Sequence, residues 1–383
     1  MEQALKNLPE FMKTQIFLIN YSNFMVLKND VFKLIFSCLL AGLLIKAPQW
    51  FGLIADGDGY YMKNVSISIF MGLSVYISLS KSNIKRKQLV ISLLIFILST
   101  VYINLLPKHE NSDSVTLAYL HLPLILWSLY GLIYIGFDTK DSLKRIDYLK
   151  YNGDLAIITA VILIAGAALS ILTIGLFSAI DMNIENVYMD NIGIIGIISS
   201  PIVATYIIRN YPLVTNKIAP IIANIFSPLV LVMLVIFLIF IIPAGKDPYS
   251  DRDFLLVFNL MLLGVMAIIV FSVTGTSINK KQNISEWTLF ILALITLIID
   301  LVALSAILYR LGEYGFTPNR TAVLGSNILI LGNLITITVN LYKVVIKKQE
   351  IKKVELAIAK YLPLYAIWAL LVTFLFPILF RMR

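Results

Sequence analysis

Asp300 is the residue with the clearest chemical potential, because it is the only charged side chain in the apolar run 287–309. A carboxylate in apolar surroundings is costly, and such residues are usually paired, protonated or in contact with a water-filled cavity. One interpretation is an ion or proton site. The other is a hydrogen bond from Asp300 to an asparagine or threonine of a neighbouring helix.

A second apolar run, 321–342, offers such partners at helical spacing. Its polar residues on one face are Ser326, Asn333, Thr336 and Asn340. Asn224 lies in another apolar run, 218–243. Amide side chains can link helices in an apolar medium, so these residues are predicted either to join helices or to contact a substrate.

The segment between the runs that contain Asp300 and Asn333 has the pattern of a capped turn. Gly315 permits a left-handed conformation, and Thr317 followed by Pro318 is a typical helix start. Around the turn lie Arg310, Glu313, Tyr314 and Arg320. We expect either an ion-paired cap or a site for an anionic group at the helix start.

Two further runs each contain a Ser-Pro pair near the middle, with prolines at Pro201 and Pro228. Each proline removes an amide donor and clashes with the carbonyl four residues earlier, at Ile197 and Asn224. Both helices are therefore predicted to kink. Kinked helices frame many transporter sites, but they also occur as plain packing kinks in membrane helices.

Common catalytic signatures are missing from the sequence. There is no phosphate-binding Walker loop, no His-Glu-x-x-His and no Gly-x-Ser-x-Gly. The chain has two histidines, His109 and His121, and one cysteine, Cys38. We expect no metal site and no cofactor, and the sequence does not favour an enzyme.

The elements that would hold these residues follow from composition. Of the 383 residues, 59% are hydrophobic and 14% are charged, whereas soluble domains have about 25% charged residues. The apolar residues form continuous blocks of about twenty, the length of a helix that crosses a bilayer. We predict an all-α integral membrane protein, a polytopic bundle of about eleven transmembrane helices. The predicted spans are 32–54, 63–80, 88–106, 118–136, 155–180, 191–208, 218–243, 254–273, 287–309, 321–342 and 359–380.

Lysine and arginine alternate between the loops and thereby predict the orientation. They are concentrated in loops on the side of the N-terminus, at 81–87, 140–150, 209–217, 280–281 and 343–360. The N-terminus is therefore predicted to be cytoplasmic and the C-terminus outside. The net charge of +9 then reflects contact with membrane lipids, and no nucleic-acid partner is expected.

The predicted organisation is one transmembrane domain, 31–383, preceded by a cytoplasmic segment, 1–30. This segment has apolar residues at helical spacing and could lie on the membrane surface, although Pro9 weakens that pattern. The loops are too short for a soluble catalytic domain.

The turn also carries a family resemblance. The run from Tyr314 to Arg320, preceded by Arg310, resembles the domain-of-unknown-function 4153 family of bacterial multi-pass membrane proteins. The segments 121–127 and 145–154 are similar to that family as well. The resemblance implies a bacterial inner-membrane protein and implies no reaction, substrate or cofactor.

Three functions remain open from the sequence. A permease-like or channel-like protein would have a polar cavity that reaches Asp300, Asn333 or Asn224. A membrane subunit or scaffold, working with another membrane protein or with itself, would have a dry interior. An intramembrane enzyme on lipid-linked substrates would need charged groups that converge at one interface, and only Arg310, Glu313 and Arg320 qualify.

Overall fold

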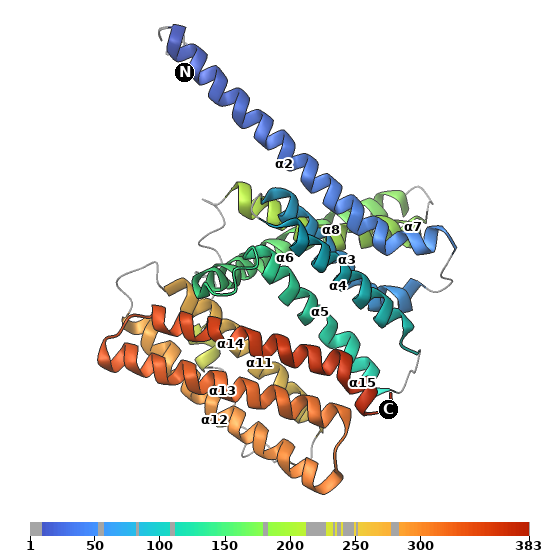
Figure 1. The fold of residues 1–383 in the computed structure, drawn as a ribbon. Coiled ribbons are helices and arrows are strands. Elements are labelled where there is room, and N and C mark those ends of the chain that lie inside the picture. The colour runs from blue at the N-terminus through green and yellow to red at the C-terminus, as the bar shows by residue number, and fades with distance from the viewer. Residues whose placement is uncertain are drawn as a thin grey trace.

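The computed structural model describes residues 10–52, 57–81, 84–107, 112–178, 183–211, 227–232, 234–235, 239, 249, 252–276 and 283–382. Within these ranges the chain forms helices and short turns and no β-strand. The principal helices are α2 (Glu10–Trp50), α3 (Gly57–Ser80), α4 (Arg86–Leu105), α5 (Asp113–Tyr134), α6 (Ser142–Ser178), α7 (Glu185–Tyr188), α8 (Ile194–Asn210), α11 (Arg252–Thr276), α12 (Asn283–Tyr314), α13 (Pro318–Lys347), α14 (Lys352–Leu370) and α15 (Phe376–Leu379). Figure 1 shows their arrangement.

The expectation of an all-α membrane bundle is confirmed. In the described part of the chain, 9 helical segments are long and apolar enough to cross a bilayer. They coincide with predicted spans one to six and nine to eleven. The predicted span 254–273 coincides with α11, whose Leu262–Val273 stretch is apolar. Most of the predicted span 218–243 lies outside the described residues, so the total of eleven stays a prediction.

Several helices extend beyond the apolar runs that predicted them. The fifth span was predicted to begin at 155, but α6 begins at Ser142. The additional turns contain Lys144, Arg145 and Asp147, which suit water or lipid head groups rather than hydrocarbon. Because hydropathy detects only the part of a helix inside the lipid, it misses such polar extensions.

Among the described residues, two large hydrophobic cores lie side by side and share one helix, and a small third cluster of Leu117, Ala322, Val372 and Phe376 joins α5 to α13 and to the C-terminal end of the chain. The first core is built by α2, α3, α4, α5 and α8, and the second by α11, α12, α13 and α14. Helix α6 contributes Tyr148 and Tyr151 to the first core and Leu149 to the second. We call these two groups the N-terminal and C-terminal bundles. They meet where α5 packs against α13 and α14.

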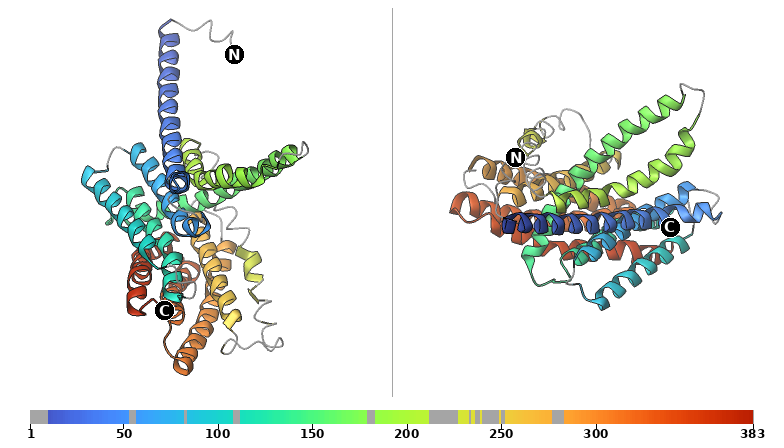
Figure 2. Two further views of the ribbon diagram at one scale, coloured as in Figure 1. Left: turned by 90° about the vertical axis from the view of Figure 1, so that its right-hand side faces the viewer. Right: turned by 90° about the horizontal axis from the view of Figure 1, so that it is seen from above.

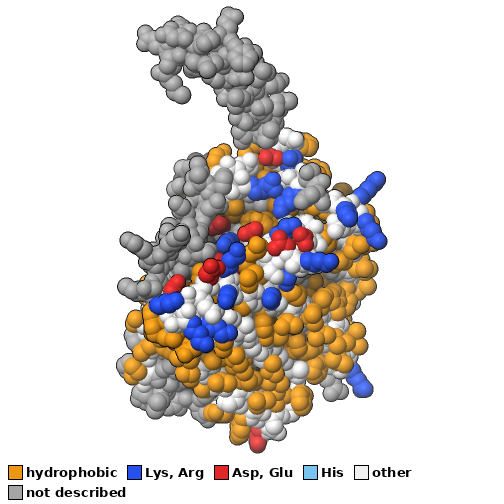
Figure 3. Space-filling view, turned by 60° about the vertical axis from the view of Figure 1, so that its left-hand side comes forward, with side chains coloured by type: hydrophobic (Ala, Val, Ile, Leu, Met, Phe, Trp, Pro, Cys, Tyr) orange, Lys and Arg blue, Asp and Glu red, His pale blue; other side chains and the backbone are white. Residues whose placement is uncertain are grey.

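Charged side chains gather at one end of the bundles (Figure 3). Contacts between distant segments show which helix ends meet there. Lys150 of α6 forms a 3.4 Å ion pair with Glu355 of α14, and Arg145 donates to the Ala359 carbonyl oxygen at 3.1 Å. Arg209 at the end of α8 donates to the Ser80 carbonyl oxygen at the end of α3, at 3.4 Å. We call this the charged end.

Two parts of the structure project from the bundles. Helix α2 is continuous from Glu10 to Trp50, and its N-terminal part extends away from the other described helices (Figure 1). Helices α6 and α8 diverge as an arm on one side (Figure 2). Its apolar side chains are largely exposed, including Ile164 and Ile171, both at 71%. The predicted surface position of residues 1–30 stays a prediction, and Leu5 and Leu8 lie outside the described residues.

Candidate functional site

Asp300 lies at the centre of the C-terminal bundle. Its side chain is completely buried in α12, and neither carboxylate oxygen has a hydrogen-bond partner in the described part of the chain. The predicted hydrogen bond to an asparagine or threonine is therefore not formed there. A carboxyl group at such a depth is usually protonated, paired or hydrated, and the described neighbours supply no pairing group.

Asn333 and Tyr365 lie on the two helices that pack near Asp300. Asn333 of α13 donates from Nδ2 to the Tyr365 hydroxyl of α14 at 3.0 Å, and its Oδ1 has no partner among the described residues. Asn333 and Tyr365 thus link α13 to α14, and we group them with Asp300 of the adjacent helix α12 as the polar cluster.

The other polar residues predicted for this site point elsewhere. Thr336 donates to the Gly332 carbonyl oxygen at 2.8 Å, and Asn340 donates to the Thr336 carbonyl oxygen at 2.8 Å. Both hydrogen bonds lie within α13, so neither residue links helices through them. Asn224 lies outside the described residues.

A cavity of about 570 Å³ adjoins the polar cluster on the side facing the N-terminal bundle. It is lined by α5 on one side and by α11, α13 and α14 on the other, and Tyr365 forms part of its wall. Most lining side chains are apolar, among them Leu117, Leu263, Ile330 and Leu362. The volume is typical of small-molecule sites, which also tend to lie between helix bundles.

Two polar side chains lie on opposite walls of this cavity. The Asn327 side chain is 2% exposed and lines the cavity; its Nδ2 is buried and has no hydrogen-bond partner in the described part of the chain. His121 lies across from it on α5, with Nδ1 2.9 Å from the Leu117 carbonyl oxygen. In the neutral ring this bond assigns the proton to Nδ1 and leaves Nε2 as an acceptor. A side-chain rotation of Asn327 would be needed to bring its donor to the cavity surface.

A second cavity of about 370 Å³ continues along the same seam. Both cavities are lined by Trp127 and Ser128 of α5 and by Leu362 and Ala366 of α14. We call the two together the seam cavity. Along α5 it extends over 117–135, roughly 27 Å at 1.5 Å per residue, close to the ~30 Å of a hydrocarbon core.

The wall of the seam cavity is fixed by α6. The Trp127 indole donates to Asn152 Oδ1 at 2.9 Å, and the Tyr148 hydroxyl donates to the Trp127 carbonyl oxygen at 2.7 Å. At the charged end, Arg145 lines the cavity and donates to the carbonyl oxygens of Ala359 and Thr139, each at 3.1 Å. The seam cavity thus has an apolar body and a cationic end.

The turn between α12 and α13 has the predicted capped form. Gly315 has φ +74°, and Thr317 accepts a hydrogen bond from the Arg320 amide at 3.3 Å. The Arg320 guanidinium donates to the carbonyl oxygens of Tyr314 and Gly315 at 2.8 and 2.9 Å, and it also lies 5.4 Å from the centre of the Tyr314 ring. Through these hydrogen bonds Arg320 caps the C-terminal end of α12. Arg310 lies 6.0 Å from the same ring centre, and Glu313 is exposed.

The first Ser-Pro pair lies inside α8. Ser200 donates to the Ile197 carbonyl oxygen at 2.8 Å, the carbonyl that Pro201 leaves without its helical donor. In the second pair, the Ser227 hydroxyl lies 2.7 Å from that of Ser272 on α11. Pro201 and Pro228 both lie outside the lining of the seam cavity, so neither proline frames it, and the predicted kinks stay predictions.

Sequence reasoning missed most of the residues that border the seam cavity. It selected Ser326 of α13, which lines the cavity and accepts from the Trp368 indole at 3.1 Å, but not the adjacent Asn327, whose Nδ2 has no hydrogen-bond partner in the described part of the chain. Tyr365 and His121 gave no distinct signal, since a tyrosine or histidine in an apolar run is common. The usable signal was the amide of Asn327 in the middle of an apolar helix.

Comparison with known protein families, with curated proteins and with solved structures found no match for this chain. The resemblance of the turn to the domain-of-unknown-function 4153 family therefore stays a prediction.

Proposed function

We propose that this chain is a permease-like protein that binds an apolar or amphiphilic solute in the seam cavity. The observation that carries the proposal is the position of this cavity between two bundles whose main cores are distinct and which are joined at one end of the seam by the small cluster around Leu117 and Ala322. Transporters commonly hold their substrates at such an interface, because a movement of one bundle against the other opens the site. A cavity within a single core would offer no such movement.

The lining specifies the chemistry of the solute. Its apolar walls favour a hydrocarbon body, and the His121 imidazole favours one polar group that donates a hydrogen bond. Asp300 supplies a fully buried ionisable group in the same bundle, which is the candidate for a coupled proton or cation.

The experiment uses the single cysteine of the chain. A Cys38→Ser variant provides a background without thiols, and Ser128→Cys then places one thiol in the wall shared by both parts of the seam cavity. In proteoliposomes, a small water-soluble thiol reagent is expected to modify this thiol. The matched control is Leu94→Cys on the exposed apolar face of α4, which is predicted to face lipid and to stay unmodified.

A library of apolar and amphiphilic compounds then tests binding directly. Compounds that fit are expected to protect Ser128→Cys and to raise the melting temperature. Ala366→Trp, which fills the same cavity, should abolish both effects. If Ser128→Cys is as inert as Leu94→Cys, the cavity is dry and the permease proposal is wrong.

We further propose eleven spans in the bacterial inner membrane, with a cytoplasmic N-terminus and an outside C-terminus. The meeting of Lys81, Lys144, Arg145 and Arg209 at one end of the bundles supports this orientation, because cytoplasmic loops are enriched in such residues. Single cysteines at Gln349 and Glu313 should react with impermeant reagents from opposite sides. Reaction of both from the same side would contradict this topology.

One observation favours a second candidate, a membrane subunit that binds another membrane protein or a second copy of itself. Gly166 of α6 and Gly196 of α8 have open space where a side chain would extend, and small residues often mark contacts between membrane helices. Gly166→Leu is expected to disrupt such an assembly without lowering the melting temperature of the single chain. An unchanged oligomeric state would count against this candidate.

A further inference from the structure

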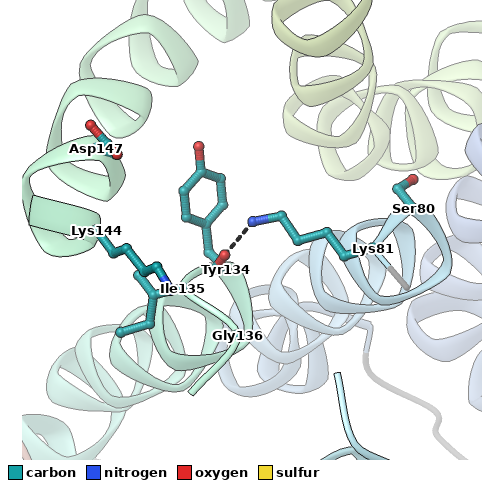
Figure 4. A pocket seen from close by; sticks show the side chains of 7 residues that line it. All are labelled: Ser80, Lys81, Tyr134, Ile135, Gly136, Lys144 and Asp147. Carbon is teal, nitrogen blue, oxygen red and sulfur yellow. Dashed lines mark hydrogen bonds between the residues drawn. The ribbon is translucent and has the colours of Figure 1, made fainter. Parts of the chain in front are cut away.

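A polar cavity of about 530 Å³ lies at the charged end, next to the seam cavity. Its lining comes from three helix ends: Ser80 and Lys81 at the end of α3, Tyr134 to Gly136 at the end of α5, and Lys144 and Asp147 at the start of α6. Figure 4 shows Lys81 and Lys144 approaching this space from different helices, with Tyr134 between α3 and α6. Lys81 donates to the Tyr134 carbonyl oxygen, and its Nζ lies 4.2 Å from the centre of the Tyr134 ring.

The lining of this cavity carries two lysines, Lys81 and Lys144, and one carboxylate, Asp147. Burial lowers the pKa of Lys81, and the charges of Arg209 and Lys144 lower it further, while Asp147 acts in the opposite direction with the smallest effect. Lys144 forms a 2.7 Å ion pair with Asp138, and this aspartate therefore offsets part of the charge. The side chain of Lys144 is still 44% exposed, so its remaining donors are accessible.

The cavity also connects to the apolar seam. Ile135 lines both the polar cavity and the seam cavity. Lys144, which lines the polar cavity, is followed in sequence by Arg145, which lines the seam cavity. A group with negative charge can thus occupy the polar cavity while an attached chain lies along the seam. Basic pockets between membrane helices bind phosphate-containing head groups in this manner.

We propose that the cavity lined by Lys81, Tyr134 and Lys144 binds a phosphate group. The two lysines provide charge-assisted hydrogen bonds to its oxygens. The group belongs either to an anionic phospholipid or to a soluble phosphate compound. This site does not depend on transport through the seam cavity, and it would exist in a non-transporting membrane subunit as well.

The experiment measures melting temperatures of the full-length protein with two probes. Inorganic phosphate is titrated into detergent-purified protein against chloride at equal ionic strength. Separately, nanodiscs of phosphatidylcholine are compared with nanodiscs that also contain phosphatidic acid. We expect at least one probe to stabilise the protein: stabilisation by phosphatidic acid alone assigns a lipid head group, and stabilisation by inorganic phosphate assigns a soluble source.

Variants test whether the stabilisation by the probe arises at this cavity. Lys144→Gln is expected to weaken the binding of the stabilising probe about tenfold, the usual scale for the loss of one charge-assisted hydrogen bond. Lys81→Gln should do the same, and Lys144→Gln carries the test if Lys81→Gln fails to fold. Lys87→Gln, which removes the same charge from an exposed position nearby, should have no effect. Absence of stabilisation by both probes, or equal weakening by Lys87→Gln, would overturn the proposal.

Discussion

The Ser200 hydroxyl donates a hydrogen bond to the carbonyl oxygen of Ile197, at 2.8 Å within α8. This carbonyl would otherwise lack a donor, because Pro201 has no amide hydrogen. In lipid, where water cannot replace the missing bond, such compensation is required for a proline inside a helix.

Ser200→Ala is therefore expected to lower the free energy of unfolding by about 0.5–1.5 kcal/mol. The measurement is denaturant or thermal unfolding in detergent. The double variant Ser200→Ala, Pro201→Ala restores a backbone donor and should recover most of the loss. If Pro201→Ala deepens the loss instead, the serine does not act through this carbonyl.

Gly325 and Gly332 determine how closely α13 approaches α14. A methyl group at Gly325 would collide with the Trp368 ring, and one at Gly332 would collide with the Tyr361 hydroxyl. Gly325→Ala is expected to destabilise the protein by about 1–3 kcal/mol, the usual range for an overpacked core. Gly264→Ala in α11, with open space around it, should leave the melting temperature unchanged or raise it. Equal effects of the two substitutions would show that the change in stability comes from helix propensity and not from the contact with Trp368.

Asp300 presents two buried oxygens without partners in the described structure. If the carboxyl binds no ion, Asp300→Leu removes this penalty and is expected to stabilise the fold by about 1–3 kcal/mol. Thr296→Val, one turn away and equally buried, changes little, because Thr296 bonds only within its helix. Destabilisation by Asp300→Leu, measured by thermal unfolding, would indicate that a bound cation or proton holds the cluster together.

Lys81 gives the protein a pH-dependent stability. Burial first, and then Arg209 and Lys144, lower its pKa in the folded state below the unfolded value, which is about 10.4. Between the two pKa values the unfolded chain binds more protons, so stability rises with pH through this alkaline range. The melting temperature of the wild type should therefore rise relative to that of Lys81→Gln as the pH increases toward 10. A constant difference between the two proteins would contradict this.

Local sequence patterns were sufficient to predict the capped turn at Thr317 and the apolar parts of the helices, because capping and hydropathy depend on residues close together in the chain. Asp300 was also found, since one charge in an apolar run is conspicuous. Its surroundings were not predicted correctly, because Thr336 and Asn340 share a helical face with Asn333 but satisfy their hydrogen bonds within α13. The seam cavity and the charged-end cavity depend on how α5 meets α14 and α6. In the seam cavity this packing joins residues more than a hundred positions apart, and in the charged-end cavity it joins three separate helix ends. No periodicity within one helix reports either.

Helix α6 belongs to both cores, with Tyr148 in one and the next residue, Leu149, in the other. Side chains one position apart point about 100° from each other around the axis, so a small rotation of α6 would shift both packings at once. We therefore expect that neither bundle unfolds while α6 stays packed against both cores. Heating should accordingly produce a single cooperative transition, although the chain contains two hydrophobic centres.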